Sequence, residues 1–164
     1  MLWKVWAPVK AKILSWLLHQ NRLWCNDRLQ RRRWPNPYFC QFCLKNLESS
    51  VHLFWNCPFT QATWAKVAEW NGCSSLAPPL QDQGCTPSAV TTILNVIRAE
   101  NRRGVKTMIM ATTWAIWMER NNCTFRTKNV VLKDVIDAIR RMMEHWRLAG
   151  AKSIEPPFGD LGVR

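Results

Sequence analysis

Acidic side chains are scarce in this sequence of 164 residues, where 11 Asp and Glu stand against 23 Lys and Arg for a formal net charge of +12. The carboxylates are scattered, and they form neither a cluster suited to two-metal phosphoryl transfer nor a Tyr-x-Asp-Asp polymerase sequence. A glycine-rich phosphate loop and a defensible Ser/His/Asp set are missing as well. The sequence therefore predicts a protein that is not an enzyme.

Long apolar runs are also missing. The best candidate, Val105 to Met118, falls short of the ~20 residues needed to cross a bilayer, and it contains three threonines and a lysine. Residues 1–20 carry three lysines and no small-residue cleavage site, unlike a secretory signal. We expect no membrane partner and no secretion, with nuclear or cytoplasmic residence left open. A basic targeting or membrane-surface helix at residues 1–20 is an alternative that fits less well than core packing.

The basic excess makes nucleic acid the first partner to consider, because such a charge attracts polyanions. The charge is uneven along the chain. Residues 1–57 contain nine basic and two acidic side chains, residues 58–97 one and two, and residues 98–164 thirteen and seven. Two basic ends thus flank a nearly neutral middle.

Helical spacing of apolar residues and the absence of a convincing strand series predict a mostly α fold. One helix begins near Pro8, with Val9, Ile13, Trp16 and Leu17 on one side. Further helices are expected at Asp27–Arg32, Pro58–Trp70, Ser88–Arg103, Val105–Arg120 and Val131–Leu148, with Gly104, Asn121-Asn122 and Gly150 as stops. Eleven tryptophans spread along the chain are expected mostly in the core.

Four residues carry the chemistry: Cys40, Cys43, His52 and Cys57 form a C-x2-C-x8-H-x4-C pattern. A C-x2-C turn places two thiolates on one side of a tight loop, and the histidine and third cysteine complete a four-ligand zinc site of the structural type. Such a set leaves no position for a reactive water. The alternative is a pair of buried cysteines with a core histidine. The remaining cysteines are isolated and are expected to be ordinary thiols: Cys25, Cys73, Cys85 and Cys123.

Composition changes divide the chain around this motif. Residues 71–88 are rich in Gly, Ser and Pro and are predicted to be a linker. A zinc-binding domain at 1–70 precedes it, a group of about three helices at 89–150 follows, and 151–164 is expected to be a loose tail. On this division, chelation of zinc should unfold residues 35–60 and leave the helices beyond Ser88 largely intact.

The residues around the motif resemble the zinc-binding domain that lies downstream of the polymerase in plant non-LTR (LINE-type) retrotransposons. The resemblance rests on Trp3, Pro8-x-Lys10-x-Lys12, Trp16, Arg28-Leu29, Cys40-x2-Cys43, Glu48, His52-Leu53-Phe54, Cys57-Pro58 and Trp64. It implies a bound Zn²⁺ with the same four ligands. Two positions depart from the pattern without removing a ligand: Cys25 stands where the family usually has threonine, and Leu44 where a glycine often follows.

A second stretch, Trp114 to Asn122 with Phe125, is similar to the segment that follows this domain in such polyproteins. Together the two resemblances imply a retroelement fragment, or a gene derived from one, that kept the zinc module and lost the catalytic parts.

Basic residues near the motif suggest that it binds RNA or single-stranded nucleic acid with little sequence specificity. The candidates are Lys10, Lys12, Arg28, Arg31, Arg32, Arg33 and Lys45, with Trp34, Tyr38, Phe39 and Phe42 available to stack on bases. Alternatively, the arginine run is a solvated helix end and the aromatic residues pack around the zinc loop. A hypothesis of another class is a structural or protein-interaction module that uses tryptophan-rich faces.

Overall fold

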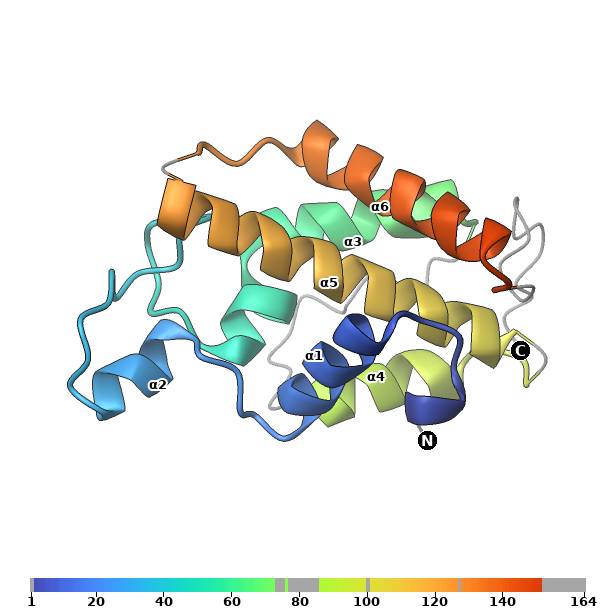
Figure 1. The fold of residues 1–164 in the computed structure, drawn as a ribbon, viewed down its shortest axis with the longest axis horizontal. Coiled ribbons are helices and arrows are strands. Elements are labelled where there is room, and N and C mark those ends of the chain that lie inside the picture. The colour runs from blue at the N-terminus through green and yellow to red at the C-terminus, as the bar shows by residue number, and fades with distance from the viewer. Residues whose placement is uncertain (1, 73–75, 77–85, 100, 127, 152–164) are drawn as a thin grey trace.

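Helices make up the fold of the computed structural model, which describes residues 2–72, 76, 86–99, 101–126 and 128–151 (Figure 1). They are η1 (Leu2–Lys4), α1 (Val9–His19), α2 (Asn26–Arg31), η2 (His52–Asn56), α3 (Pro58–Trp70), α4 (Thr86–Asn95), α5 (Arg102–Arg126) and α6 (Leu132–Leu148). No strand occurs in these residues, which confirms the mostly α expectation. Most of the expected linker and tail, 73–75, 77–85 and 152–164, lie outside the described residues. No described helix combines the length and apolar character of a bilayer-spanning segment.

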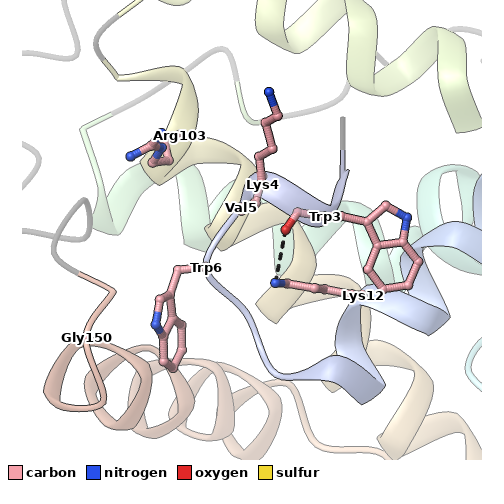
Figure 2. A pocket seen from close by; sticks show the side chains of 7 residues that line it. All are labelled: Trp3, Lys4, Val5, Trp6, Lys12, Arg103 and Gly150. Carbon is pink, nitrogen blue, oxygen red and sulfur yellow. Dashed lines mark hydrogen bonds between the residues drawn. The ribbon is translucent and has the colours of Figure 1, made fainter.

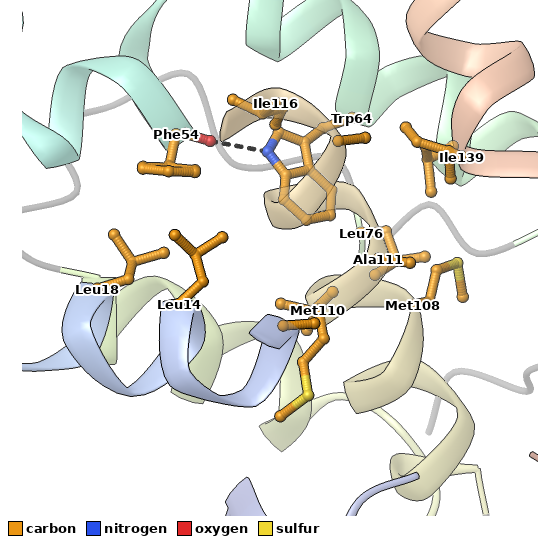
Figure 3. Close-up of a cluster of buried hydrophobic side chains, with 14 of the residues drawn as sticks. Leu14, Leu18, Phe54, Trp64, Leu76, Met108, Met110, Ala111, Ile116 and Ile139 are labelled. Carbon is orange, nitrogen blue, oxygen red and sulfur yellow. Dashed lines mark hydrogen bonds between the residues drawn. The ribbon is translucent and has the colours of Figure 1, made fainter. Parts of the chain in front are cut away.

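Helix α5 runs through the middle of the molecule, with α3 and α6 on one side and α1 and α4 on the other (Figure 1). It packs on α6 and on α1, while α3 packs on α6 and α4 on α1. Its side chains from Val105 to Thr113 are almost all buried, because this helix has apolar neighbours around most of its circumference. Figure 3 shows the resulting core, in which side chains from four helices meet: Leu14, Leu18, Trp64, Met108, Met110, Ile116 and Ile139.

Helix α3 begins and ends as the sequence predicts. Pro58 occupies its first position, where the missing N–H costs nothing. The helix is anchored to the preceding segment by Trp64, whose Nε1 donates to the Phe54 carbonyl at 2.8 Å and whose ring stacks on Trp55 at 5.1 Å. These contacts bury both tryptophans completely and hold the end of the zinc motif against α3.

Two predicted helix boundaries are wrong. The predicted helix Ser88–Arg103 ends at Asn95, and a new helix begins at Arg102 and continues through Gly104 to Arg126. A glycine costs only about 1 kcal/mol in a helix, which is too little to stop one whose following residues are buried. Asn121-Asn122 does not stop it either, since tertiary contacts of Arg120 hold this turn in place.

The apolar face of α1 is also not the one that the spacing suggested. The buried residues are Ala11, Leu14, Ser15 and Leu18. Val9, Ile13 and Trp16 point outward, with 65%, 43% and 40% of their surfaces exposed. The helix carries apolar residues on two sides, and only one side can face α5.

A buried ion pair joins the zinc motif to α5. Glu48, between the second and third motif residues, lies 2.7 Å from Arg120, and their side chains are 0% and 3% exposed. Arg120 also donates through Nε to both Glu48 oxygens, at 3.1 and 3.2 Å, and through an Nη to Asn26 Oδ1 at 3.1 Å. Asn26 donates its own backbone N–H to Glu48 and its side-chain amide to the Phe39 carbonyl. Residues 26, 39, 48 and 120 are thus fixed in one network.

We predict that Arg120→Met lowers the free energy of unfolding by about 3–5 kcal/mol, because it leaves the buried Glu48 carboxylate without its charge partner. Urea unfolding of the zinc-loaded protein measures the loss. The exposed Arg141→Met on α6 is the matched control, with an expected change within about 0.5 kcal/mol. The double variant Glu48→Met/Arg120→Met should recover part of the loss. A single variant as stable as the control would contradict this account.

Candidate metal centre

The first half of the metal site is a tight turn that backbone hydrogen bonds close. The Cys40 N–H donates to the Asn46 carbonyl at 2.8 Å, and the Leu44 N–H donates to the Cys40 carbonyl at 2.8 Å. An isolated antiparallel bridge between Phe39 and Leu47 holds the two ends of the turn together. This local structure brings Cys40 and Cys43 to one side of the loop.

Leu44, directly after the second cysteine, adopts a left-handed conformation with φ of 53°. The side chain is 68% exposed, so its burial contributes little stability to offset the cost of the left-handed backbone. Glycine reaches the left-handed region without the steric cost that a Cβ imposes. The glycine that the resemblance leads one to expect at this position would therefore adopt this backbone conformation without the strain that Leu44 imposes.

The second half of the site is built by η2, a single wide helical turn. Ser49 Oγ accepts the His52 N–H at 3.1 Å at its start, and the Cys57 N–H donates to the His52 carbonyl at 2.7 Å at its end. This i→i+5 bond spaces His52 and Cys57 so that both face the C-x2-C turn. π-type turns of this kind are frequent at functional sites.

The four side chains meet in the arrangement expected of a tetrahedral zinc site. Their ligand atoms all lie within 4.8 Å of one another. Cys40 Sγ lies 3.9 Å from Cys57 Sγ, and Cys43 Sγ lies 3.3 Å from His52 Nε2. Tetrahedral bonds of the usual Zn–S and Zn–N lengths place two sulfurs about 3.8 Å apart and a sulfur and nitrogen about 3.6 Å apart. The residues therefore fit Zn²⁺, and His52 presents Nε2 as its ligand atom.

The surroundings of the cysteines favour thiolates at two of the three positions. Burial raises the pKa of Cys43, but the backbone N–H groups of Lys45 and Asn46 lower this pKa more, and the net shift is downward. The neighbouring Cys40 thiol lowers the pKa of Cys57, and the N–H groups of Phe59 and Thr60 in the first turn of α3 lower it further. The hydrogen bond with Cys57, followed by burial, raises the pKa of Cys40 to about 12. Cys40 must lose its proton to bind Zn²⁺ as a thiolate, so metal binding at this position releases a proton.

The segment before the C-x2-C turn carries arginines and tryptophans that are exposed, apart from the half-buried Arg28. We call them the Arg–Trp surface: Trp24, Arg28, Arg31, Arg32, Arg33 and Trp34. The Trp24 and Trp34 rings stack at 5.3 Å with an angle of 26°, although 42% and 49% of the two residues are exposed. The Arg32 guanidinium lies 4.9 Å from the Trp24 ring centre and 5.6 Å from that of Trp34.

The other arginines of the Arg–Trp surface are held by local contacts. Arg28 lies 5.5 Å from the Trp24 ring and donates to the Asn21 carbonyl. Arg31 is 3.6 Å from Asp27, its side chain 76% exposed. Arg33 is exposed and follows the end of α2 in a left-handed conformation. The side chains of Arg31, Arg32 and Arg33 are exposed to solvent, whereas Arg28 is half-buried.

The remaining candidate residues lie in several places. Lys10 and Lys45 are exposed on α1 and on the C-x2-C turn. Lys12 is half-buried and lines a pocket with Trp3 and Arg103. Tyr38 and Phe39 are exposed, with their rings in edge contact at 4.9 Å, whereas Phe42 packs on Phe59 of α3 at 4.8 Å. Cys25 and Cys123 are free thiols outside the four-residue cluster, and Cys73 and Cys85 lie outside the described residues.

Sequence reasoning misses two features of this region. The sequence gives no sign that Arg120 pairs with Glu48, because the two residues are 72 positions apart. Trp24 belongs to none of the sequence motifs, although its position two residues before α2 and its nearness to four arginines are signals. A run of charges with an isolated aromatic residue beside it does not by itself indicate that their side chains touch.

Comparison with known proteins agrees with this site. Residues 1–64 match the family described as zinc-binding in reverse transcriptase, and this range includes all four metal-binding residues. A segment of 66 residues is 30% identical to a protein of Arabidopsis thaliana named as a putative ribonuclease H protein, covering 40% of this chain and 11% of that protein. The chain thus spans about a tenth of the length of this curated relative. No solved structure gives a significant match. The family match confirms the resemblance to the retrotransposon zinc-binding domain over the N-terminal part of the chain.

We predict one zinc ion per chain, absent when Cys40→Ser and Cys43→Ser are combined, because two of four ligands disappear. Metal analysis of protein purified under reducing, zinc-replete conditions measures the stoichiometry. Cys123→Ser is the matched control and should retain the metal. Zinc affinity should fall as the pH falls, since protons compete for the thiolates and for His52. Wild-type protein without zinc, or a double variant that keeps it, would show that the site is not a metal centre.

We also predict that Leu44→Gly raises the free energy of unfolding of the zinc-loaded protein by up to about 1 kcal/mol, because glycine relieves the left-handed backbone at this position. Chemical unfolding measures the gain. Leu44→Ala separates the two contributions of the side chain, since alanine keeps the Cβ that causes the strain and should bring no gain. An equal gain from both variants would mean that the leucine side chain, and not the backbone, limits stability.

Proposed function

We propose that this chain, whose residues 1–64 match the zinc-binding family of reverse transcriptases, binds RNA or single-stranded DNA without catalysing a reaction. The zinc-binding module itself is not a catalytic domain. In this proposal the metal has a structural role, because three thiolates and one imidazole complete its tetrahedral coordination and leave no position for a reactive water.

The observation that carries the proposal is the Arg–Trp surface. Aromatic rings with about half of their surface exposed offer stacking platforms to unpaired bases, and every base has a face that can stack. Arginine side chains beside them neutralise phosphates and supply affinity that is independent of sequence. Tyr38 and Phe39 extend the exposed aromatic area toward the C-x2-C turn. This combination favours flexible single strands over duplexes, whose bases are stacked on one another.

The anchoring of α2, which carries Arg28 and Arg31 of this surface, also supports binding. Helix α2 is tied to the zinc turn by the hydrogen bond from Asn26 Nδ2 to the Phe39 carbonyl. Asp27 donates its N–H to the Glu48 carbonyl in the same region. Binding therefore requires little ordering of the backbone, which lowers the entropy cost of association.

A second candidate function is protein interaction, favoured by the exposed apolar side of α1. Val9, Ile13 and Trp16 lie one turn apart on that side and are exposed. Such a stripe is typical of helices that pack on a partner. In a longer polyprotein this side of α1 would be covered by another domain.

We predict that the triple variant Arg31→Ala/Arg32→Ala/Arg33→Ala weakens binding to RNA and single-stranded DNA together. The slope of log K against log salt should fall in magnitude by about 0.7 for each phosphate that the variant no longer binds. Fluorescence anisotropy with a labelled oligonucleotide over a salt series measures both quantities. The zinc content should not change, because none of the three residues is a ligand.

The matched control is Lys133→Ala/Arg140→Ala/Arg141→Ala, which removes the same charge from α6. Trp34→Ala tests the stacking contribution and should weaken single-strand binding by about 1–3 kcal/mol, with a smaller effect on duplex DNA. Equal losses of affinity in the two triple variants would mean that the net charge of the chain, and no particular surface, attracts the nucleic acid. Binding that is undetectable near 100 mM salt would favour the interaction module.

A further inference from the structure

A pocket of about 390 Å³ opens where η1, the start of α1, the start of α5 and the end of α6 meet (Figure 2). Its volume lies in the range of small-molecule sites. Seven residues line it: Trp3, Lys4, Val5, Trp6, Lys12, Arg103 and Gly150. Three of them are cationic, two are tryptophans, and none is acidic.

The three cations are free to bind an anion. Lys4, Lys12 and Arg103 form no salt bridge within the described part of the chain. The Lys12 Nζ donates to the Trp3 carbonyl at 3.3 Å, which fixes the ammonium group at the pocket and leaves two of its three N–H donors unused. Lys4 and Arg103 are exposed. Positive charge from three separate elements therefore lines this space.

The charges at the helix N-termini beside the pocket also favour the binding of an anion. The first turns of α1 and α5 contain no acidic residue, and they carry Lys10 with Lys12 and Arg102 with Arg103. A cation at a helix N-terminus faces the positive end of the helix dipole, which destabilises the helix, whereas an anion there stabilises it. Two neighbouring helices with this unfavourable charge indicate a place where an external anion completes the electrostatics.

Trp3 adds a flat apolar surface beside the cations. It is 57% exposed, and Figure 2 shows its ring standing out from the chain near Lys12. The backbone that carries it is held, because Val5 is buried and the Trp6 carbonyl accepts the Thr107 hydroxyl at 3.1 Å. Trp6 differs, since its ring packs on Trp146 at 6.2 Å and forms a wall of the pocket. A cationic pocket with one exposed indole matches the two parts of a nucleotide, phosphate and base.

We propose that this pocket binds one nucleotide of a single-stranded nucleic acid, with its phosphate on Lys4, Lys12 and Arg103 and its base on Trp3. The assignment rests on the proposed function and adds a second contact to it. The Arg–Trp surface lies just beyond the other end of α1, since Arg28 donates to the carbonyl of Asn21, two residues after that helix. A strand bound at both places would follow α1.

The test is the double variant Lys12→Gln/Arg103→Gln in the full chain, with a labelled single-stranded RNA and a KCl series. Removal of two phosphate-binding charges should lower the magnitude of the log K against log salt slope by about 1.4. The control, Lys133→Gln/Arg141→Gln, removes the same charge from exposed positions on α6 and should leave the slope unchanged. The conservative variant Lys12→Arg/Arg103→Lys should keep the wild-type slope, which separates loss of charge from loss of fold.

The base contact is tested by Trp3→Ala, which should weaken RNA binding at least about fivefold. Phe125→Ala removes an aromatic side chain that is 76% exposed near the end of α5, away from the pocket, and should have no such effect. Photocrosslinking of RNA that contains 5-iodouridine should label the peptide with Trp3. Trp3→Phe should retain most of the affinity, because a smaller ring still stacks.

The outcomes separate this assignment from the proposed function. If Lys12→Gln/Arg103→Gln and Trp3→Ala bind like their controls while the Arg31–Arg33 variant loses binding, the pocket assignment alone is overturned. If the wild-type chain binds no RNA, both fall. A free mononucleotide is another source of the same chemistry, so uridine 5′-monophosphate is titrated at matched ionic strength. Binding as tight as that of the oligonucleotide would overturn the assignment to a strand.

Discussion

The buried ion pair between Glu48 and Arg120 is the contact on which the arrangement of this molecule depends. One partner comes from the zinc loop and the other from the last turns of the longest helix. Because a charge buried without its partner costs several kcal/mol, the loop has one acceptable position on α5. Asn26 binds both partners and joins the start of α2 to them. The metal centre, α5 and the Arg–Trp surface are therefore linked by direct contacts, and the zinc ion fixes more than the loop that binds it.

The fold gathers positive charge at two places on the molecule, the Arg–Trp surface and the pocket beside Lys12. In the Arg–Trp surface, Arg28 and Arg32 lie against exposed tryptophan rings, a geometry in which charge and stacking can act on the same strand. At the pocket, Lys12 lies in the first turn of α1 and Arg103 in the first turn of α5, and neither first turn contains an acidic residue. Both features raise the local positive potential, and Asp27, 3.6 Å from Arg31, offsets only part of it at the Arg–Trp surface. A polyanion would neutralise the positive charge at both places, which is why we propose a nucleic acid as the ligand.

Short-range patterns in the sequence predict much of this structure, and long-range contacts account for what they miss. Spacing and residue chemistry are enough for the metal ligands, for α3 from Pro58 to Trp70, and for the mostly α class, because each depends on residues close in sequence. Gly104 predicts a helix stop, yet the buried residues that follow it keep α5 continuous. The outward side of α1 cannot be recognised from spacing, since that helix has apolar residues on two sides and only packing against α5 selects one. Pairing of Glu48 with Arg120 spans 72 positions and has no local signature.

The contacts of Glu48 and Arg120 make the zinc loop and the C-terminal half of α5 one cooperative unit, which hydrogen exchange followed by mass spectrometry can test. The zinc-loaded protein and the protein after chelation are compared peptide by peptide. Removal of zinc should lower protection in residues 35–60 and also in residues 114–126, because Glu48 no longer holds Arg120. Residues 135–146 of α6 should change least. Unchanged protection in residues 114–126, with reduced protection confined to the zinc loop, would contradict this cooperativity and would support the two independent parts that the sequence suggests.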